Sequence, residues 1–205
     1  MKSLNQFGKS VSIISTAALV SIASMTQIAI AKDQQYYEGT ATLCAMSTNV
    51  IMPPDMKGNN GVSYKDDMTF VYLIKSEDSD LMNGWELMTN KWKQTKSGNA
   101  FNTGEVVLAP EVDGYDGTLE GRFNFRAEDA NNISGRYKGT GDFTGVTADY
   151  NLGAPYLVPV EEGPDCSQAL AVCTDCIPAA FPIDPTVPQF YYNQYDMSGW
   201  VNNFE

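Results

Sequence analysis

Apolar and polar residues alternate most regularly between residues 118 and 127 of the chain. One face of this segment carries Leu119, Gly121, Phe123 and Phe125, and the intervening residues are polar or charged. A two-residue period of this kind predicts a β-strand with one buried face and one face in water.

Residues 69–75 show a different pattern, because both faces of the segment are apolar. One face carries Phe70, Tyr72 and Ile74, and the other carries Val71 and Leu73. A strand that is apolar on both faces needs cover on both, and we expect the aromatic C-terminal tail to supply the second cover.

Strand-like runs recur through residues 36–152, separated by residues typical of turns. The predicted strands cover residues 36–45, 69–75, 85–92, 104–109, 117–127 and 133–146. Asn83-Gly84 predicts a tight turn, and a single short helix is predicted around residues 168–172. The sequence therefore predicts an all-β chain, a small antiparallel meander β-barrel, with a sandwich as the alternative.

The segment 153–205 differs in composition from the rest of the chain. It holds seven of the ten prolines, three of the four cysteines and no Lys or Arg. Such proline density argues against long regular elements. We expect residues 32–152 to form the barrel domain and residues 153–205 to form an irregular, disulfide-pinned tail that wraps it.

Residues 1–31 have the pattern of a secretory signal peptide. Lys2 and Lys9 make a basic start, an apolar stretch follows, and Ala29-Ile30-Ala31 supplies the small residues of a cleavage site. The alternative is a membrane anchor, but the stretch is rich in serine and no basic stop-transfer cluster follows it. The expectation is an exported protein, periplasmic or secreted, without a membrane span after cleavage.

Charge and histidine content exclude several functions. The full chain carries a formal charge of −12, which argues against binding to nucleic acid or to anionic lipid. The sequence contains 0 histidines, which excludes histidine-based nucleophilic triads and removes the commonest metal ligand. Catalysis would have to rest on carboxylates, Tyr, Lys, Arg or Cys, and we expect neither a cofactor nor a metal.

The four cysteines are Cys44, Cys166, Cys173 and Cys176, an even number in a chain with an export signal. This predicts two disulfides with three pairings open, and we favour a bridge from Cys44 to one of the other three. One alternative is a redox-active Cys173-Thr-Asp-Cys176 motif, and another is a four-thiolate zinc site.

The segment Gly135-Arg-Tyr-Lys-Gly-Thr-Gly-Asp-Phe-Thr-Gly145 is the densest pattern in the chain. Its glycines share a face with Tyr137 and Phe143 and would permit the sharp bending that small barrels need. Together with the strand 117–127 and Gly84-Trp85-Glu86, this segment resembles the small β-barrels of the allene oxide cyclase and dirigent group. The resemblance covers residues 36–152 and implies a barrel fold, but no catalytic residue of those plant enzymes transfers to a position here.

Four cations lie on the predicted outward faces of two adjacent strands: Arg122, Arg126, Arg136 and Lys138. One hypothesis is that this patch receives the acidic tail, and the alternative is a solvated face balanced by nearby carboxylates.

Five aromatic residues are candidates for lining a small hydrophobic cavity: Trp85, Trp92, Phe123, Phe125 and Phe143. The alternative is that they fill the core. The sequence favours an exported, non-catalytic binding or interaction protein whose partner is a small apolar ligand or another exported protein. Two alternatives stay open: a cyclase-like or isomerase-like enzyme that uses carboxylate and Tyr groups, and a surface or matrix interaction protein that uses the aromatic tail.

Overall fold

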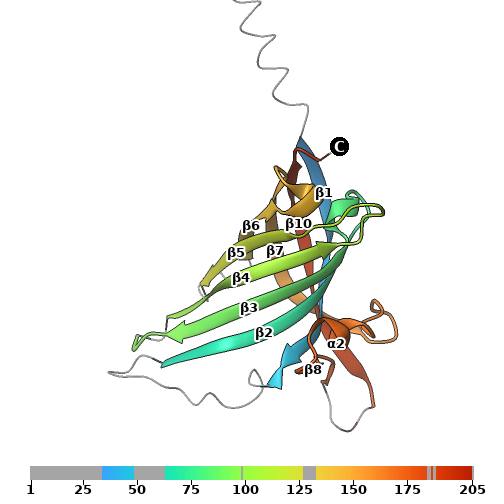
Figure 1. Cartoon of the computed structure of the whole chain (residues 1–205). Helices are drawn as coiled ribbons and strands as arrows, with labels where there is room; N and C mark the ends of the chain where they lie inside the picture. Colours follow the sequence, from blue (N-terminus) through green and yellow to red (C-terminus); the bar gives the residue numbers. More distant parts are fainter. Residues whose placement is uncertain are drawn as a thin grey trace, which may run out of the picture.

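The computed structural model describes residues 34–48, 63–97, 99–126, 133–183, 186 and 188–204, so the predicted signal peptide lies outside the described residues. The long strands are β1 (Gln34–Ser47), β2 (Ser63–Ser76), β3 (Gly84–Gln94), β4 (Ala100–Pro110), β5 (Leu119–Arg126), β6 (Ile133–Gly139), β7 (Thr147–Pro159) and β10 (Phe190–Asn202). Each pairs antiparallel with its neighbour in this order, and β10 pairs with β1. The result is a closed eight-stranded antiparallel barrel (Figure 1), which confirms the predicted fold class.

The short elements are η2 (Asp80–Met82), η4 (Gly141–Phe143), α2 (Ala169–Val172), β8 (Cys176–Pro178) and β9 (Phe181–Pro182). The short helix predicted around residues 168–172 is confirmed as α2. Leu81 and Met82 of η2 are fully buried, and the Phe143 ring of η4 stacks on Tyr115 with 5.8 Å between ring centres. We call this end of the barrel the capped end, and the end with the β3–β4 turn the hairpin end.

Alternation along the strands decides what faces the barrel interior. On β5, Leu119 and Phe123 are buried while Glu120, Arg122 and Asn124 are exposed, which confirms the faces expected from the sequence. The main core contains inward residues from all eight strands and from both 3-10 turns.

Large side chains and glycines alternate along one row of directly paired residues across the barrel. The row runs through Asn90, Gly104, Phe123, Gly135, Tyr150, Gly199 and Tyr37. A Cβ atom on Gly104 would lie 2.7 Å from the Phe123 ring, and one on Gly135 would lie 2.4 Å from the Tyr150 ring. These glycines therefore provide the space that the aromatic ring on the next strand occupies.

Replacing Gly135 with Ala should lower the free energy of unfolding by about 1–3 kcal/mol, because the new methyl group overlaps the Tyr150 ring in a packed core. Urea unfolding of the purified protein measures this. Gly153→Ala is the matched control, since the nearest atom to a Cβ there lies at 3.7 Å. Equal losses in the two variants would contradict the role given to Gly135.

Long strands cross the boundary expected at residue 152. β7 continues to Pro159, and β10 closes the barrel, so the expectation that 153–205 lacks long regular elements is wrong. The Val160 N–H donates a hydrogen bond to the Phe190 carbonyl on β10, 2.9 Å away. Because successive backbone groups of a strand point to opposite edges, the backbone nitrogens of Pro155 and Pro159 point to the edge of β7 away from β10. The pairing of β6 with β7 ends at Leu152, and within the described residues no strand pairs with the edge beyond it. Proline is tolerated there because no ladder hydrogen bond is lost.

Part of the tail fills a gap between the first and last strands of the barrel. The β1–β10 pairing stops at Thr42, after which β8 pairs with β1 and β9 pairs with β10. Between β8 and β9, the buried Ala179 donates its N–H to the Cys44 carbonyl at 3.0 Å. The tail thus continues the barrel wall where the two strands diverge.

The outer face of β2 is covered by the tail, as expected from its pattern. Val71 and Leu73 form a second apolar cluster with Ala169 of α2, and Trp85 and Leu87 pack at its edge. The cover is supplied by α2 and the cysteines rather than by the aromatic residues of the tail.

Two disulfides staple this cluster, Cys44–Cys166 and Cys173–Cys176. The favoured bridge from Cys44 to the C-terminal cysteines is confirmed, and no thiolate is left for a four-cysteine zinc site. Disulfides place the folded chain in an oxidising, non-cytoplasmic environment. Among the helices of the described segments, none has the length and apolar character needed to cross a bilayer.

Two turns differ from their predictions. The strand predicted over residues 133–146 ends at Gly139, because Gly141 and Gly145 adopt φ angles of 57° and 96° around η4. Asn83-Gly84 is not a tight turn. Asn83 is extended, and its side chain accepts a hydrogen bond from the Ser76 N–H at 2.8 Å, which fixes the loop that carries η2.

Two of the four cations of the patch pair with carboxylates on neighbouring strands rather than in the tail. Arg136 pairs with Asp149 of β7 at 2.7 Å, and Arg122 lies 3.6 Å from Glu105 of β4. The helix of the tail packs on β1, β2 and β3 instead. The hypothesis that this patch receives the tail is therefore wrong.

Candidate functional site in the barrel interior

The inward face of β3 carries two polar side chains inside an otherwise apolar core. Glu86 and Asn90 are each 3% exposed, and along the inward face of β3 they are interleaved with Met88 and Trp92. Burying a carboxyl or an amide is costly unless it finds a partner. The partners of these two residues therefore define what the interior can do.

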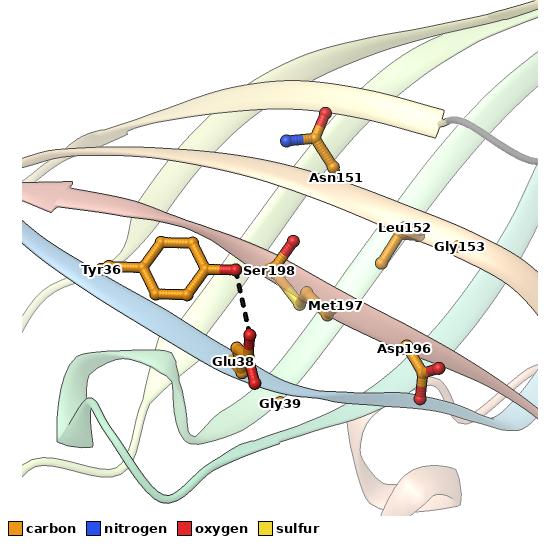
Figure 2. A pocket seen from close by; sticks show the side chains of 9 residues that line it. All are labelled: Tyr36, Glu38, Gly39, Asn151, Leu152, Gly153, Asp196, Met197 and Ser198. Atoms are coloured by element: carbon orange, nitrogen blue, oxygen red, sulfur yellow. Dashed lines mark hydrogen bonds between the residues drawn. The ribbon is translucent and has the colours of Figure 1, made fainter.

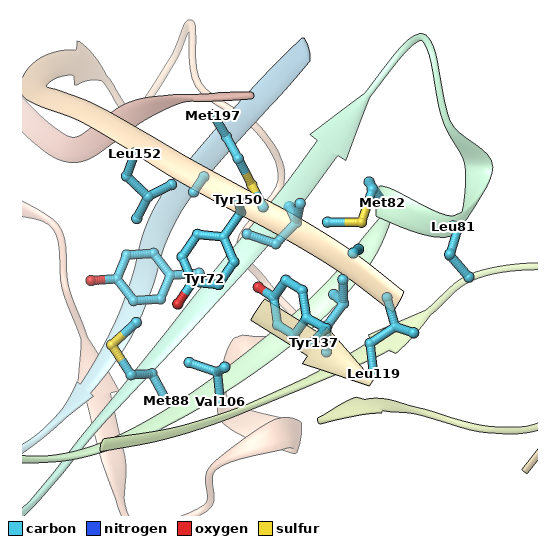
Figure 3. Close-up of a cluster of buried hydrophobic side chains, with 14 of the residues drawn as sticks. Tyr72, Leu81, Met82, Met88, Val106, Leu119, Tyr137, Tyr150, Leu152 and Met197 are labelled. Atoms are coloured by element: carbon cyan, nitrogen blue, oxygen red, sulfur yellow. The ribbon is translucent and has the colours of Figure 1, made fainter. Parts of the chain in front are cut away.

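Glu86 has a partner inside the barrel, the hydroxyl of Tyr137, which donates a hydrogen bond to Glu86 Oε2. Figure 3 shows Tyr137 among Tyr72, Tyr150 and apolar side chains of the same core. The pKa of Glu86 is raised to about 7, because the increase caused by burial is larger than the decrease caused by the hydrogen bond from Tyr137. The protonated, neutral form therefore persists into the near-neutral range.

The tyrosines around Glu86 stay protonated. Burial raises the pKa of Tyr137 and of Tyr72, and the charge of Glu86 adds to the effect. Tyr72 is the direct cross-strand neighbour of Glu86 on β2. This group is a set of hydrogen-bonding side chains in an apolar setting, deep in the barrel.

Asn90 lies nearer the hairpin end, and its amide oxygen is buried without a hydrogen-bond partner. The amide oxygen of Asn102 on β4 is in the same state. Asn90 is paired with Gly104 and Asn102 with Trp92, so the two asparagines are diagonal neighbours on one face, with their backbones about 7–8 Å apart. Each unpaired buried oxygen costs about 1–3 kcal/mol, so the pair marks a place where a hydrogen-bond donor would be stabilised.

Two aromatic residues, Trp92 and Phe123, share the inward face with the two asparagines. Trp92 shares their face and is half-buried, and the Phe123 ring lies over Gly104. The backbone register also places Phe125 opposite Asn102. Of the five aromatic residues proposed from the sequence, Trp92 and Phe123 are thus on one face, and the side chain of Phe125 lies outside what the structure describes.

The other two residues proposed for the cavity lie elsewhere. Trp85 faces outward into the cluster beneath α2, because it has the opposite parity to Trp92 on β3. Phe143 belongs to the capped end, where its ring contacts Tyr115 and Phe204. A single cavity lined by all five residues is therefore not what the structure shows. We call Asn90, Trp92, Asn102 and Phe123 the hairpin-end site.

The Glu86 group and the hairpin-end site are separate. Glu86 and Asn90 are four residues apart on β3, which corresponds to about 14 Å along the strand, and the buried Met88 lies between them. A small molecule held by Asn90 would therefore not reach the Glu86 carboxyl.

An open groove of about 430 Å³ lies on the outer surface, over β1, β10 and β7 (Figure 2). Its carboxylates are held by tyrosine hydroxyls, with Tyr36 donating to Glu38 and Tyr156 donating to Asp196, each at 3.1 Å. Within the described residues, no group of three or more Cys, Asp or Glu side chains is arranged to hold a metal ion.

The fold and the interior together define a class: a disulfide-stapled, eight-stranded antiparallel barrel with polar groups buried in its core. No protein-family model, no curated protein and no solved structure matches the chain. The resemblance to the allene oxide cyclase and dirigent group stays a prediction, and function has to be argued from the site itself.

Proposed function

We propose that this protein is an exported, non-catalytic binding barrel that holds a small, largely apolar molecule at the hairpin-end site. The observation that carries the proposal is the buried, unpartnered amide oxygen of Asn90 beside aromatic side chains. Ligand sites in proteins combine an apolar lining with a few oriented polar groups. Trp92 and Phe123 supply the apolar surface, and the asparagines supply the polar groups.

A binding role is favoured over a cyclase-like or isomerase-like reaction. The enzyme alternative rests on Glu86, whose raised pKa of about 7 suits acid–base chemistry. A general acid or base must lie within hydrogen-bond reach of its substrate. The separation of about 14 Å along β3 and the buried Met88 keep Glu86 away from the proposed ligand.

The proposed site of action is outside the cytoplasm. The disulfides require an oxidising compartment, and residues 1–31 would direct the chain there and be removed. The ligand would then be met outside the cytoplasm.

The experiment is a fluorescence titration of the purified, disulfide-bonded protein with N-phenylnaphthylamine, a neutral probe that brightens in apolar sites. We expect saturable binding of one probe per chain, weakened about tenfold by Trp92→Ala, because the variant loses aromatic contact area with the probe. Trp200→Ala is the matched control, since Trp200 is 43% exposed and packs on Tyr36 at the outer surface. Unsaturable binding, or equal weakening by both variants, would contradict the proposal.

A further inference from the structure

The unpaired polar atoms of the hairpin-end site are all hydrogen-bond acceptors. The unpartnered atoms of Asn90 and Asn102 are both amide oxygens, which only accept hydrogen bonds. Asn90 is 3% exposed and shares the inward face of β3 with Met88 and Glu86. The missing partners are therefore donors.

The two oxygens can serve one molecule. Asn90 and Asn102 are diagonal neighbours across the β3–β4 pair, with Asn90 opposite Gly104 and Asn102 opposite Trp92. Side chains of diagonal neighbours project from the same face of the sheet, so both amide oxygens are acceptors on that face. A ligand with two adjacent donors fits this spacing better than one with a single donor.

Charge in the ligand is disfavoured by the surroundings. The charged residues that follow Asn90 and Gly104 and precede Phe123 in the sequence are Lys91, Glu105 and Arg122. Strand alternation points all three to the opposite face of the wall, and they are exposed. The inward-facing residues beside Asn90 are Met88, Trp92 and Phe123. An ion placed there would lose its hydration without gaining a counter-charge.

We propose that the ligand class of this barrel is an uncharged, apolar molecule with two adjacent N–H or O–H donors, received by the amide oxygens of Asn90 and Asn102. The inference rests on the proposed function and adds the chemistry that the site selects.

The test compares two probes of the same shape, diaminonaphthalene with adjacent amino groups and its dimethyl counterpart, which has methyl groups in place of the donors. Both are titrated into the full, disulfide-bonded protein, and the ratio of their dissociation constants is measured. In Asn90→Leu the preference for the diamine should fall about tenfold relative to wild type, which corresponds to about 1.4 kcal/mol, because the variant loses one hydrogen bond to the probe. Asn102→Leu should reduce the preference in the same direction.

Thr42→Val is the matched control. The hydroxyl of Thr42 is also buried without a partner, but Thr42 lies on the outer side of β1, between the inward Ala41 and Leu43. This variant also replaces an unpaired polar group by an apolar one, and it should leave the probe ratio unchanged.

The outcomes separate the two proposals. If both probes bind and neither asparagine variant changes their ratio, the inference about donors is wrong and the binding function stands. Such a result is also expected if ordered water, rather than the ligand, satisfies the two oxygens. If neither probe binds saturably, the binding function itself is wrong.

Discussion

Replacing Cys44 and Cys166 together with alanine should lower the free energy of unfolding by about 2–5 kcal/mol, one of the two largest effects expected in this protein. The bridge joins residues 122 apart in sequence, so it restricts a long loop in the unfolded chain. It also holds α2 against the outer face of β2, where Val71 and Leu73 are buried. Chemical unfolding of the oxidised variant measures the loss.

The second disulfide provides the control for this result. Cys173 and Cys176 are 3 residues apart, so their bridge restricts the unfolded chain far less. Cys173→Ala with Cys176→Ala should therefore cost less than the first pair. An equal or greater loss would show that the long-range bridge does not dominate the stability of the tail.

The second large effect is a pH dependence that Glu86→Gln removes. The pKa of Glu86 is about 7 in the folded protein against an ordinary value of 4.5, so the folded state binds the proton more tightly than the unfolded state. The resulting stabilisation is complete below pH 4.5 and is lost as the pH rises through about 7. Relative to the glutamine variant, the wild type should lose about 3 kcal/mol across this range.

Unfolding free energies of both proteins, measured between pH 4 and pH 8, give this difference directly, because the other titrating groups are common to both. Tyr137→Phe is informative as a second variant. It removes the hydrogen bond that lowers the pKa of Glu86, so the loss should shift to higher pH. A difference between wild type and Glu86→Gln that stays constant with pH would contradict the buried, protonated carboxyl.

Much of the fold follows from local pattern. The alternation of residues 118–127 places β5 correctly, and the two-sided apolar run of residues 69–75 correctly indicates a second cover. The strands of the tail do not follow from the sequence, because the density of prolines does not reveal which edge of a strand they occupy. Pro155 and Pro159 share one edge of β7, where they interrupt no pairing.

Trp92 and Phe123 of the hairpin-end site follow from the sequence, whereas the buried polar residues Glu86, Asn90 and Asn102 do not. On β3, Trp85 and Leu87 form an apolar face that lies outside, beneath α2, so the polar Glu86 and Asn90 face inward. Sequence alone favours the opposite orientation, because it cannot show that the tail covers the outside. The combination of an outward Trp85 and an inward Trp92 on one strand is the signal that could have revealed it.

The two buried asparagine oxygens cost stability that apolar residues would not cost. Departures of this kind concentrate at functional sites, and Asn90 and Asn102 differ from the unpartnered Thr42 hydroxyl in sharing one face with each other and with Trp92 and Phe123. The same reasoning separates Asn90 from Glu86, since Glu86 has a hydrogen-bond partner within the fold and Asn90 Oδ1 has none.

Binding of a ligand at the hairpin-end site, on the inward face of the barrel, is tested most directly by intermolecular nuclear Overhauser effects. With N-phenylnaphthylamine bound to the full, disulfide-bonded protein, we predict contacts from the probe to the side chains of Trp92 and Phe123. Contacts to Trp200 on the outer surface or to Trp85 beneath α2, with none to Trp92, would contradict the account.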